Sequence, residues 1–512
     1  MKFLFQNKRN FFVLIILVLS NGMVFLDATI LPVALPKIQS MFHSTSAQIQ
    51  WMINSYLLSM AVFMVAGGKI ADMFGRRKIF CIGMGLFGIS SLFCGFSYAS
   101  WQLIGFRFMQ GIGSAMMSPA SVGLLCESFS EKERYTVIGI LGSVGSIFLT
   151  LGPLIGGYFT QYLSWHYIFF TNVPISIIAI IFTLTIIVKS PKLKEPVDIY
   201  GFLSFGFGFF FLTVALMQAR SWGWGSITII VLFGLSLISF ILLYLSDKRA
   251  IAPFIDFKLF KTPLFFCPLI IYTSVFIARM MSVFWVVFFQ NILGFSPFLA
   301  GIIIAISVCP IIFLSPFTGF FVEKFGIKKP VIFGQFLLIL AYSWLAIFMI
   351  QGNIYVLIPG LLISGIGMVL VTNISYSTAI NSVSVAKSTI ASGVIMTFRN
   401  AGSCLGVAVL GSVLTNVQFS KFSSTLSQIA PKSNPKLLEG LLSGSSKAIE
   451  VLKALPEQVQ EQTKEALSFS YSLGISIANI VAAVIIVIGL LTIFTLRKIK
   501  IRKEKIIPSP EP

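Results

Sequence analysis

The chain has 512 residues, of which 56% are hydrophobic and 11% are charged, and its mean hydropathy is +0.94. This composition excludes an ordinary soluble protein, because too little polar surface is available to enclose a core in water. The formal net charge of +20 is explained by basic loops that face anionic lipid, so it does not indicate nucleic-acid binding.

Apolar segments long enough to span a bilayer recur along the whole chain. A spanning helix needs about 20 apolar residues. We expect fourteen such helices, centred near residues 22, 60, 89, 114, 148, 178, 209, 236, 277, 309, 340, 368, 402 and 482. The alternation typical of membrane strands is absent, so the fold class is predicted to be an all-α integral membrane protein. The first segment lacks a small-residue cleavage site and should remain as a helix.

Basic residues collect in alternate loops, as they do in the cytoplasmic loops of membrane proteins. This pattern places both termini in the cytoplasm, and we expect a bacterial inner membrane. Residues 1–188 should form a six-helix bundle, 189–262 a linker with two additional helices, and 263–512 a second six-helix bundle. The last unit includes an extracytoplasmic loop at about 418–467, where apolar spacing interrupted by Pro456 predicts short amphipathic helices.

Asp27 is the acidic residue that lies well inside a long hydrophobic segment. A carboxylate inside a membrane is costly and usually marks a proton, ion or substrate pathway. Arg107 lies at a similar depth in the fourth helix, so the two can pair. Separating them would favour protonation of Asp27, which predicts proton coupling by Asp27 and Arg107. The alternative is a static salt bridge.

The loop after the second helix combines glycines with charged residues, namely Gly68, Asp72, Gly75, Arg76 and Arg77. A glycine turn between an acid and several cations allows charge-assisted hydrogen bonds between helix ends, so we expect a cytoplasmic gate. A plain basic loop is the alternative. Residues 68–78 resemble the signature loop of the major facilitator superfamily, G-x-L-A-D-R-x-G-R-K, with Met73 where that family often has Arg.

Two further elements resemble the same superfamily. Residues 107–113 in the fourth helix are similar to its R-x-x-Q-G-x-G element. The fifth helix contains the G-P-x-x-G-G element of its antiporters, formed by Gly152, Pro153, Gly156 and Gly157. The resemblance implies an antiporter hinge at these four residues, although Phe148 replaces a glycine of the fuller pattern. Small residues also suit an ordinary helix-packing face.

Other stretches narrow the resemblance to the fourteen-helix drug:proton antiporter family of the EmrB/QacA type. They include L-D-A-T-I-L-P in the first helix and residues 165–174, 290–301 and 399–408. The resemblance covers nearly the whole chain except the outer loop and the tail. It implies the major facilitator fold with two extra central helices. It also implies multidrug efflux, the proton-driven export of small amphipathic molecules by alternating access, with no cofactor.

Polar residues in other apolar helices are candidates for the lining of a central cavity: Asn54, Gln110, Arg279, Asn373, Tyr376 and Arg399. Hydrogen bonds between helices are an alternative role for these residues. For Arg279, the alternatives are bonds to carbonyl groups at a helix break and a side chain that extends to the membrane surface. If Arg279 and Arg399 face the cavity together with Arg107, the cavity has three cations and a single carboxylate, that of Asp27. This balance favours neutral or weakly acidic hydrophobic substrates over organic cations.

The function predicted from these features is transport, with small-molecule substrate, protons and lipid as partners. The alternative within transport is a dedicated exporter or symporter of one metabolite, such as a siderophore or an amino acid. An enzyme is not expected, because the sequence shows no nucleophile with a base and no metal-ligand cluster. A sensor or scaffold that uses the outer loop is a third alternative. We expect a monomer, and a periplasmic adaptor and an outer-membrane channel are candidate partners.

Overall fold

The computed structural model describes residues 8–129, 131–188, 198–251, 253–255, 257, 259–383, 388–429 and 456–495. Within these residues the chain is helical and contains no strand. Its longer helices are α2 (Lys8–Phe42), α3 (Ser46–Phe74), α4 (Arg76–Gly95), α5 (Ser100–Ser128), α6 (Glu131–Tyr162), α8 (Asn172–Ile186), α9 (Ile199–Trp222), α10 (Ile227–Arg249), α11 (Pro263–Arg279), α12 (Met281–Asn291), α13 (Pro297–Leu314), α15 (Lys328–Phe348), α16 (Ile354–Asn381), α17 (Ser388–Ile429) and α20 (Glu457–Thr495). The shorter ones are α7 (Tyr167–Phe170), α14 (Thr318–Phe325), η1 (Leu259–Lys261), η2 (Ser315–Phe317) and η3 (Met349–Gln351).

Twelve stretches of the described chain are long and apolar enough to cross a membrane. Each of the fourteen expected centres lies within a helix. The difference in number comes from α5 and α6, which have 29 and 32 residues but are not among the twelve. In α5, polar residues such as Arg107 and Gln110 lower the hydropathy of the helix.

Two of the expected helices are interrupted. The sixth consists of α7 and α8, which meet at Thr171, and the ninth consists of α11 and α12, which meet at Met280. An interrupted helix leaves backbone groups free for other partners, which membrane proteins tolerate where the break is buried in protein or lines a cavity.

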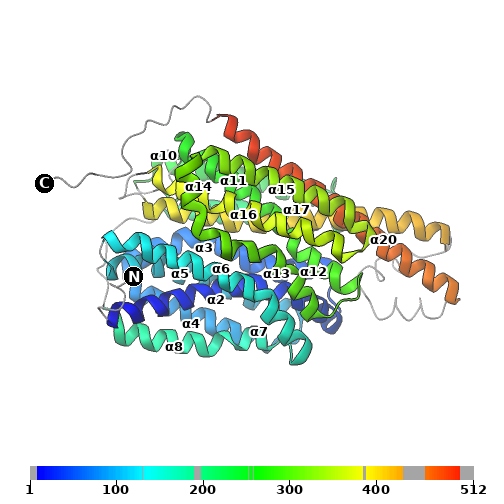
Figure 1. The fold of residues 1–512 in the computed structure, drawn as a ribbon, viewed down its shortest axis with the longest axis horizontal. Coiled ribbons are helices and arrows are strands. Elements are labelled where there is room, and N and C mark those ends of the chain that lie inside the picture. Colours follow the sequence, from blue (N-terminus) through cyan, green and yellow to red (C-terminus); the bar gives the residue numbers. More distant parts are fainter. Residues whose placement is uncertain are drawn as a thin grey trace.

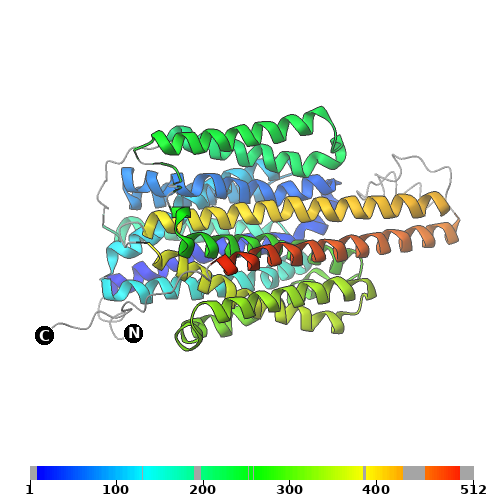
Figure 2. The same ribbon diagram turned by 90° about the horizontal axis from the view of Figure 1, so that it is seen from above.

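The helices pack in two layers that meet along the length of the molecule (Figures 1 and 2). Helices α2 to α8 pack mainly on one another, as do α11 to α20, whereas α9 and α10 pair at one edge. Contacts between the layers run through α6 with α13, α3 with α17, and α2 with α12. The predicted boundary at 188 adjoins residues 189–197, which lie outside the described part. The boundaries at 188 and 262 both stay predictions.

Close contacts of α5 bring its polar face against its neighbours. A Cβ atom on Gly113 would lie 2.6 Å from the amide nitrogen of Phe87 and 2.7 Å from the carbonyl oxygen of Gly83. Gly111 similarly faces the Tyr56 carbonyl oxygen on α3. Small residues allow such close approach of helix backbones. They place Arg107 and Gln110 between α3 and α4.

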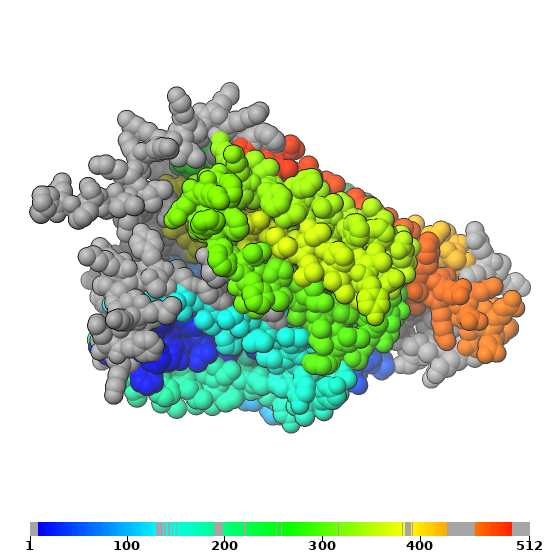
Figure 3. All heavy atoms as spheres, viewed as in Figure 1, coloured from blue at the N-terminus to red at the C-terminus, as the bar shows by residue number. Residues whose placement is uncertain are grey.

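The segment at 418–467 differs in part from the expectation of short helices. The long helix α17 continues to Ile429, and α20 begins directly after Pro456; both extend beyond the other helices (Figures 1 and 3). They pack along each other, and Phe422 and Leu426 of α17 are buried in this extended part. Residues 430–455 of this segment, with the expected helix before Pro456, lie outside the described residues.

Candidate functional site

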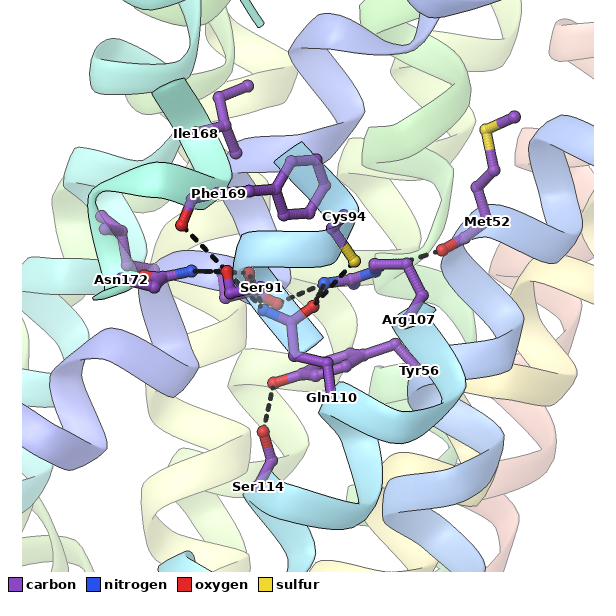
Figure 4. A network of polar contacts seen from close by, with 12 residues as sticks. Met52, Tyr56, Ser91, Cys94, Arg107, Gln110, Ser114, Ile168, Phe169 and Asn172 are labelled. Atoms are coloured by element: carbon purple, nitrogen blue, oxygen red, sulfur yellow. Dashed lines mark hydrogen bonds and ion pairs between the residues drawn. The ribbon is translucent and has the colours of Figure 1, made fainter. Parts of the chain in front are cut away.

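A network of buried polar side chains joins four helices around Asp27 of α2. Figure 4 shows four of its members, Ser91, Arg107, Gln110 and Asn172. Arg107 of α5 donates a hydrogen bond to one oxygen of the Asp27 carboxylate. The other oxygen accepts from the amide of Gln110 at 3.1 Å and from the amide of Asn172, which begins α8, at 3.3 Å. Ser91 of α4 accepts from both amides, at 3.2 and 3.0 Å. The predicted pairing of Asp27 with Arg107 is therefore confirmed as a contact.

The guanidinium of Arg107 is held on its other sides by α3. Its Nε donates to the carbonyl oxygen of Met52 at 3.3 Å, and its central carbon lies 4.0 Å from the centre of the Tyr56 ring. The Tyr56 hydroxyl in turn shares a hydrogen bond with Ser114 of α5 at 3.0 Å (Figure 4). Asp27 and Arg107 are 1% and 2% exposed. The pair is therefore enclosed by protein on every side.

This enclosure has an energetic consequence. Taking two charges out of water costs several kcal/mol for each ion, and good geometry with further hydrogen bonds offsets that cost. The Asp27 carboxylate accepts hydrogen bonds from three side chains. Arg107 donates to the side-chain oxygen of Gln110 at 2.8 Å as well as to Asp27 and Met52. The network is thus stable while complete, and movement of one member leaves a costly unpaired charge.

Sequence reasoning did not assign roles to Ser91 and Asn172. Asn172 stands in one of the stretches that carry the family resemblance, which could have drawn attention to it. Ser91 has no comparable signal, since serines in membrane helices commonly bond their own backbone. Here Ser91 instead donates to the carbonyl oxygen of Phe169 in α7 at 2.9 Å.

The predicted gate residues meet at the junction of α3, α4 and α5. Arg76 donates to Asp72 at 2.7 Å and to Glu127 at 3.1 Å, so it joins α4 to the ends of two other helices. Gly75 has a φ of 99°, which favours glycine at the turn. Arg77 donates to the carbonyl oxygen of Leu184 in α8, and Gly68 packs near Pro119.

The predicted hinge residues lie where α6 meets α2 and α13. A Cβ atom on Gly156 would lie 2.6 Å from the carbonyl oxygen of Ile30, and one on Gly157 would lie 2.7 Å from that of Pro297. Gly152 faces Thr29, and α6 continues through Pro153 as one helix. These residues therefore serve close packing in this conformation, and their hinge role stays a prediction.

A cavity lies between the two layers of helices. Its lining includes Thr29, Arg279, Trp285, Tyr342 and Arg399. The other predicted cavity residues lie elsewhere. Gln110 belongs to the Asp27 network, Asn54 donates to the sulfur of Met217 at 3.0 Å, Asn373 donates to Ser315 at 2.9 Å, and the Tyr376 ring lies 6.2 Å from that of Tyr272.

Helix α2 separates the cavity from the buried ion pair. Val24, Ala28 and Thr29 line the cavity, whereas Asp27 does not. Phe25 of α2 also lies on the cavity side, since its ring centre is 4.9 Å from the guanidinium carbon of Arg399 in α17. One face of α2 thus contacts the cavity, and another holds Asp27 against α5.

Comparison with known proteins agrees with this architecture. The model of the Major Facilitator Superfamily matches residues 17–407. The chain belongs to the Major Facilitator Superfamily. It is 31% identical over 412 residues to the multidrug resistance protein Stp of Mycobacterium tuberculosis, covering 80% of this chain and 76% of that protein. It is 26% identical to the tetracenomycin C resistance and export protein of Streptomyces glaucescens, covering 92% and 89%.

Solved structures of membrane transporters share the fold. A bacterial homolog of the human lysosomal transporter Spinster, in an inward-facing and unoccupied conformation, matches with a TM-score of 0.63. The identity is 18%, and the match covers 96% of this chain and 98% of that one. The chain is therefore a multi-pass membrane transporter of small molecules and not an enzyme. In the described residues, no group of three or more His, Cys, Asp or Glu side chains could hold a metal ion.

Proposed function

We propose that this Major Facilitator Superfamily transporter exports small amphipathic molecules in exchange for protons. The observation that carries the proposal is the Asp27 carboxylate, buried in a membrane helix beside a cavity and paired with Arg107. Proton uptake by Asp27 would weaken its attraction for Arg107, and loss of the proton would restore it. The pair therefore acts as the proton-sensitive element.

Helix α2 provides the route by which the proton site acts on the substrate cavity. It contains Pro32 and Pro36, and its residues Pro32 and Val33 also line the cavity. Because one continuous helix carries both surfaces, a shift of Asp27 relative to α5 also moves the cavity wall. The two conformations of alternating access are then biased by both ligands, which is the requirement for coupling.

Polar contacts between helices occur at both ends of the molecule, and we call each set a latch because it can hold its end of the transporter closed. At one end, Gln290 of α12 donates to the carbonyl oxygen of Val33 at 2.8 Å, and the backbone of Phe298 donates to Gln161 at 3.1 Å. At the other, Arg76 joins Asp72 and Glu127. We propose that the first latch closes the outer end and the second organises the cytoplasmic gate, while the glycines of α6 permit the outer helices to separate.

We further propose that α5 and α6 are spans, which gives the expected fourteen. Both are long, and both pack against spanning helices in the bundle. Two six-helix bundles flanking α9 and α10 follow from this count. Both termini would face the cytoplasm of a bacterial inner membrane, as the distribution of basic loops indicates. The transporter would act as a monomer, driven by the proton gradient and without a cofactor. A periplasmic adaptor would bind the segment at 418–467.

A dedicated exporter of one metabolite is the second candidate. The relative from Streptomyces glaucescens is named for resistance to a single compound, tetracenomycin C, which favours this alternative. The breadth of substrates separates the two functions. A multidrug exporter accepts chemically unrelated molecules, whereas a dedicated exporter accepts one compound and its close analogues.

Reconstitution of the purified protein into liposomes tests the proposal. With a fluorescent amphipathic compound and an imposed pH gradient, we expect substrate movement against the direction of proton flow. A protonophore should abolish this movement. Equal transport with and without the gradient, or proton flow in the same direction as substrate, would contradict antiport.

A further inference from the structure

The cavity between the two layers of helices contains two arginines and no acidic residue among its described lining. Arg279 ends α11, at the break that separates it from α12, and Arg399 lies within α17. Their guanidinium carbons lie 5.8 and 5.1 Å from the centre of the same ring, that of Phe276. Two positive charges of the C-terminal helices therefore lie beside one aromatic ring of the cavity lining.

These arginines differ from Arg107 because neither has an anionic partner in the described part of the chain. Arg107 pairs with Asp27, and Arg76 pairs with Asp72 and Glu127, whereas no described acidic residue pairs with Arg279 or Arg399. Arg399 donates weakly to the sulfur of Met396 at 3.7 Å, and Arg279 makes no hydrogen bond with a described residue. Arg279 therefore does not bond carbonyl groups of the described residues at the helix break, which is one of the alternative roles that the sequence suggests for it.

Charged groups without partners are expensive inside a membrane protein and usually belong to a substrate pathway. Here repulsion between two neighbouring guanidiniums adds to that cost. An anion between them would lower the cost for both, because guanidinium groups bind carboxylates with strong, directional hydrogen bonds. The arrangement thus favours a negatively charged ligand over a neutral one and disfavours a cation.

The remaining lining of the cavity suits the apolar part of such a ligand. Phe276, Trp285 and Tyr342 contribute aromatic surface, and the rings of the last two lie 5.8 Å apart. Ser403 and Asn400 add polar groups near Arg399 in the same helix. Pockets with mostly apolar walls and few polar groups fix the orientation of a ligand through those groups.

We propose that this cavity binds amphipathic aromatic acids as anions, with the carboxylate held by Arg279 and Arg399. This inference rests on the proposed function, since it names the class of molecule exported through the same cavity. The acid supplies the negative charge that the cavity lacks. One bound carboxylate lowers the combined formal charge of the two arginines and the ligand from +2 to +1, so it reduces the unpaired charge inside the cavity.

Binding to the purified full-length protein tests this assignment without a proton gradient. Three probes of similar size differ in charge: 1-naphthoate, 1-naphthamide and 1-naphthylmethylammonium. Isothermal titration in detergent should give an affinity for the acid at least about tenfold higher than for the amide, since hydrogen bonds to charged groups contribute about 1.5–3 kcal/mol. The ammonium compound should bind most weakly.

Variants identify the residues responsible. Arg279→Gln and Arg399→Gln should each remove most of the preference for the acid and leave the affinity for the amide, which also reports correct folding. Arg399→Lys should retain part of the preference. The matched control is Arg249→Gln, at the exposed end of α10, which should bind all three probes as the unchanged protein does.

Equal affinities for acid and amide, tighter binding of the ammonium compound, or no saturable binding of the acid would each overturn the assignment. A preference for the acid that survives both glutamine substitutions would overturn it as well. The proposed function is tested separately, by transport driven by a pH gradient. If the acid binds selectively but no pH gradient drives its transport, antiport is wrong and the anion site stands.

Discussion

Gln110 contacts both members of the buried ion pair, donating to Asp27 at 3.1 Å while its oxygen accepts from Arg107 at 2.8 Å. The amide therefore closes a ring of hydrogen bonds around the two charges. Because an amide does not ionise, Gln110 can hold the geometry of the pair in both charge states that we propose for the carboxylate.

Asp27→Asn should abolish transport driven by a pH gradient, because an amide cannot carry the exchanged proton. We expect the rate in liposomes to fall to that measured without a gradient, while exchange of labelled substrate across the membrane continues. Asp27→Glu is the matched control, since it keeps a carboxylate and should keep gradient-driven transport in part. Full coupling in the asparagine variant would exclude Asp27 as the proton site.

Arg107→Gln should destabilise the protein strongly, because Asp27 is then a buried charge without its partner. Breaking a buried pair in this way costs about 3–5 kcal/mol. Adding Asp27→Asn to this variant removes the remaining charge and should recover much of the loss. Thermal unfolding in detergent measures both effects. Arg249→Gln, at an exposed position, should change the free energy of unfolding by no more than about 0.5 kcal/mol. Additive losses in the double variant would show that the pair does not interact.

Two glycines on α5 should respond to alanine with opposite sign. At Gly113 a Cβ atom meets the backbone of Phe87, so Gly113→Ala should cost about 1–3 kcal/mol and disturb the network. At Gly105 nothing lies within 4 Å, so Gly105→Ala should stabilise by about 0.4–1 kcal/mol through reduced freedom of the unfolded chain. Unfolding measurements on both variants decide the point, and equal effects would refute the packing argument.

Arg76→Gln should alter the conformational equilibrium more than the stability. Its side chain is 20% exposed, so each of its two ion pairs contributes at most about 1 kcal/mol. That energy still shifts an equilibrium between two conformations about fivefold. Spin labels at the exposed positions Phe74 and Phe325 can follow the separation of α3 and α14. Lys78→Gln, which removes an exposed charge beside the gate, should leave the distance distribution unchanged.

The local features of the chain were sufficient to predict its helices. Length and apolarity determine which segments can span a bilayer, and the fourteen expected centres all lie in helices. The pairing of Asp27 with Arg107 could also be predicted, because an ionisable side chain inside a membrane needs a partner at matching depth. The interruptions at Thr171 and Met280 had no clear local signal and depend on packing around them.

The separation of the ion pair from the cavity could not be predicted in the same way. It depends on the rotation of α2 about its axis, and neighbouring residues on a helix differ by about 100° in direction. The sequence does not specify which side of α2 faces α5, so Gln110 was expected in the cavity rather than beside Asp27. The roles of Ser91 and Asn172 likewise depend on how α4 meets α8.

The two longest helices have a mechanical consequence. With 42 residues, α17 is about 63 Å long at 1.5 Å per residue, roughly twice the hydrocarbon thickness of a bilayer. Its far portion packs along α20 and belongs to the same continuous helix as Arg399, so a tilt of α17 at the cavity also moves its tip. Small rotations of that helix become large displacements at the tip, where a fluorophore or an antibody fragment could register each turnover from outside the bilayer.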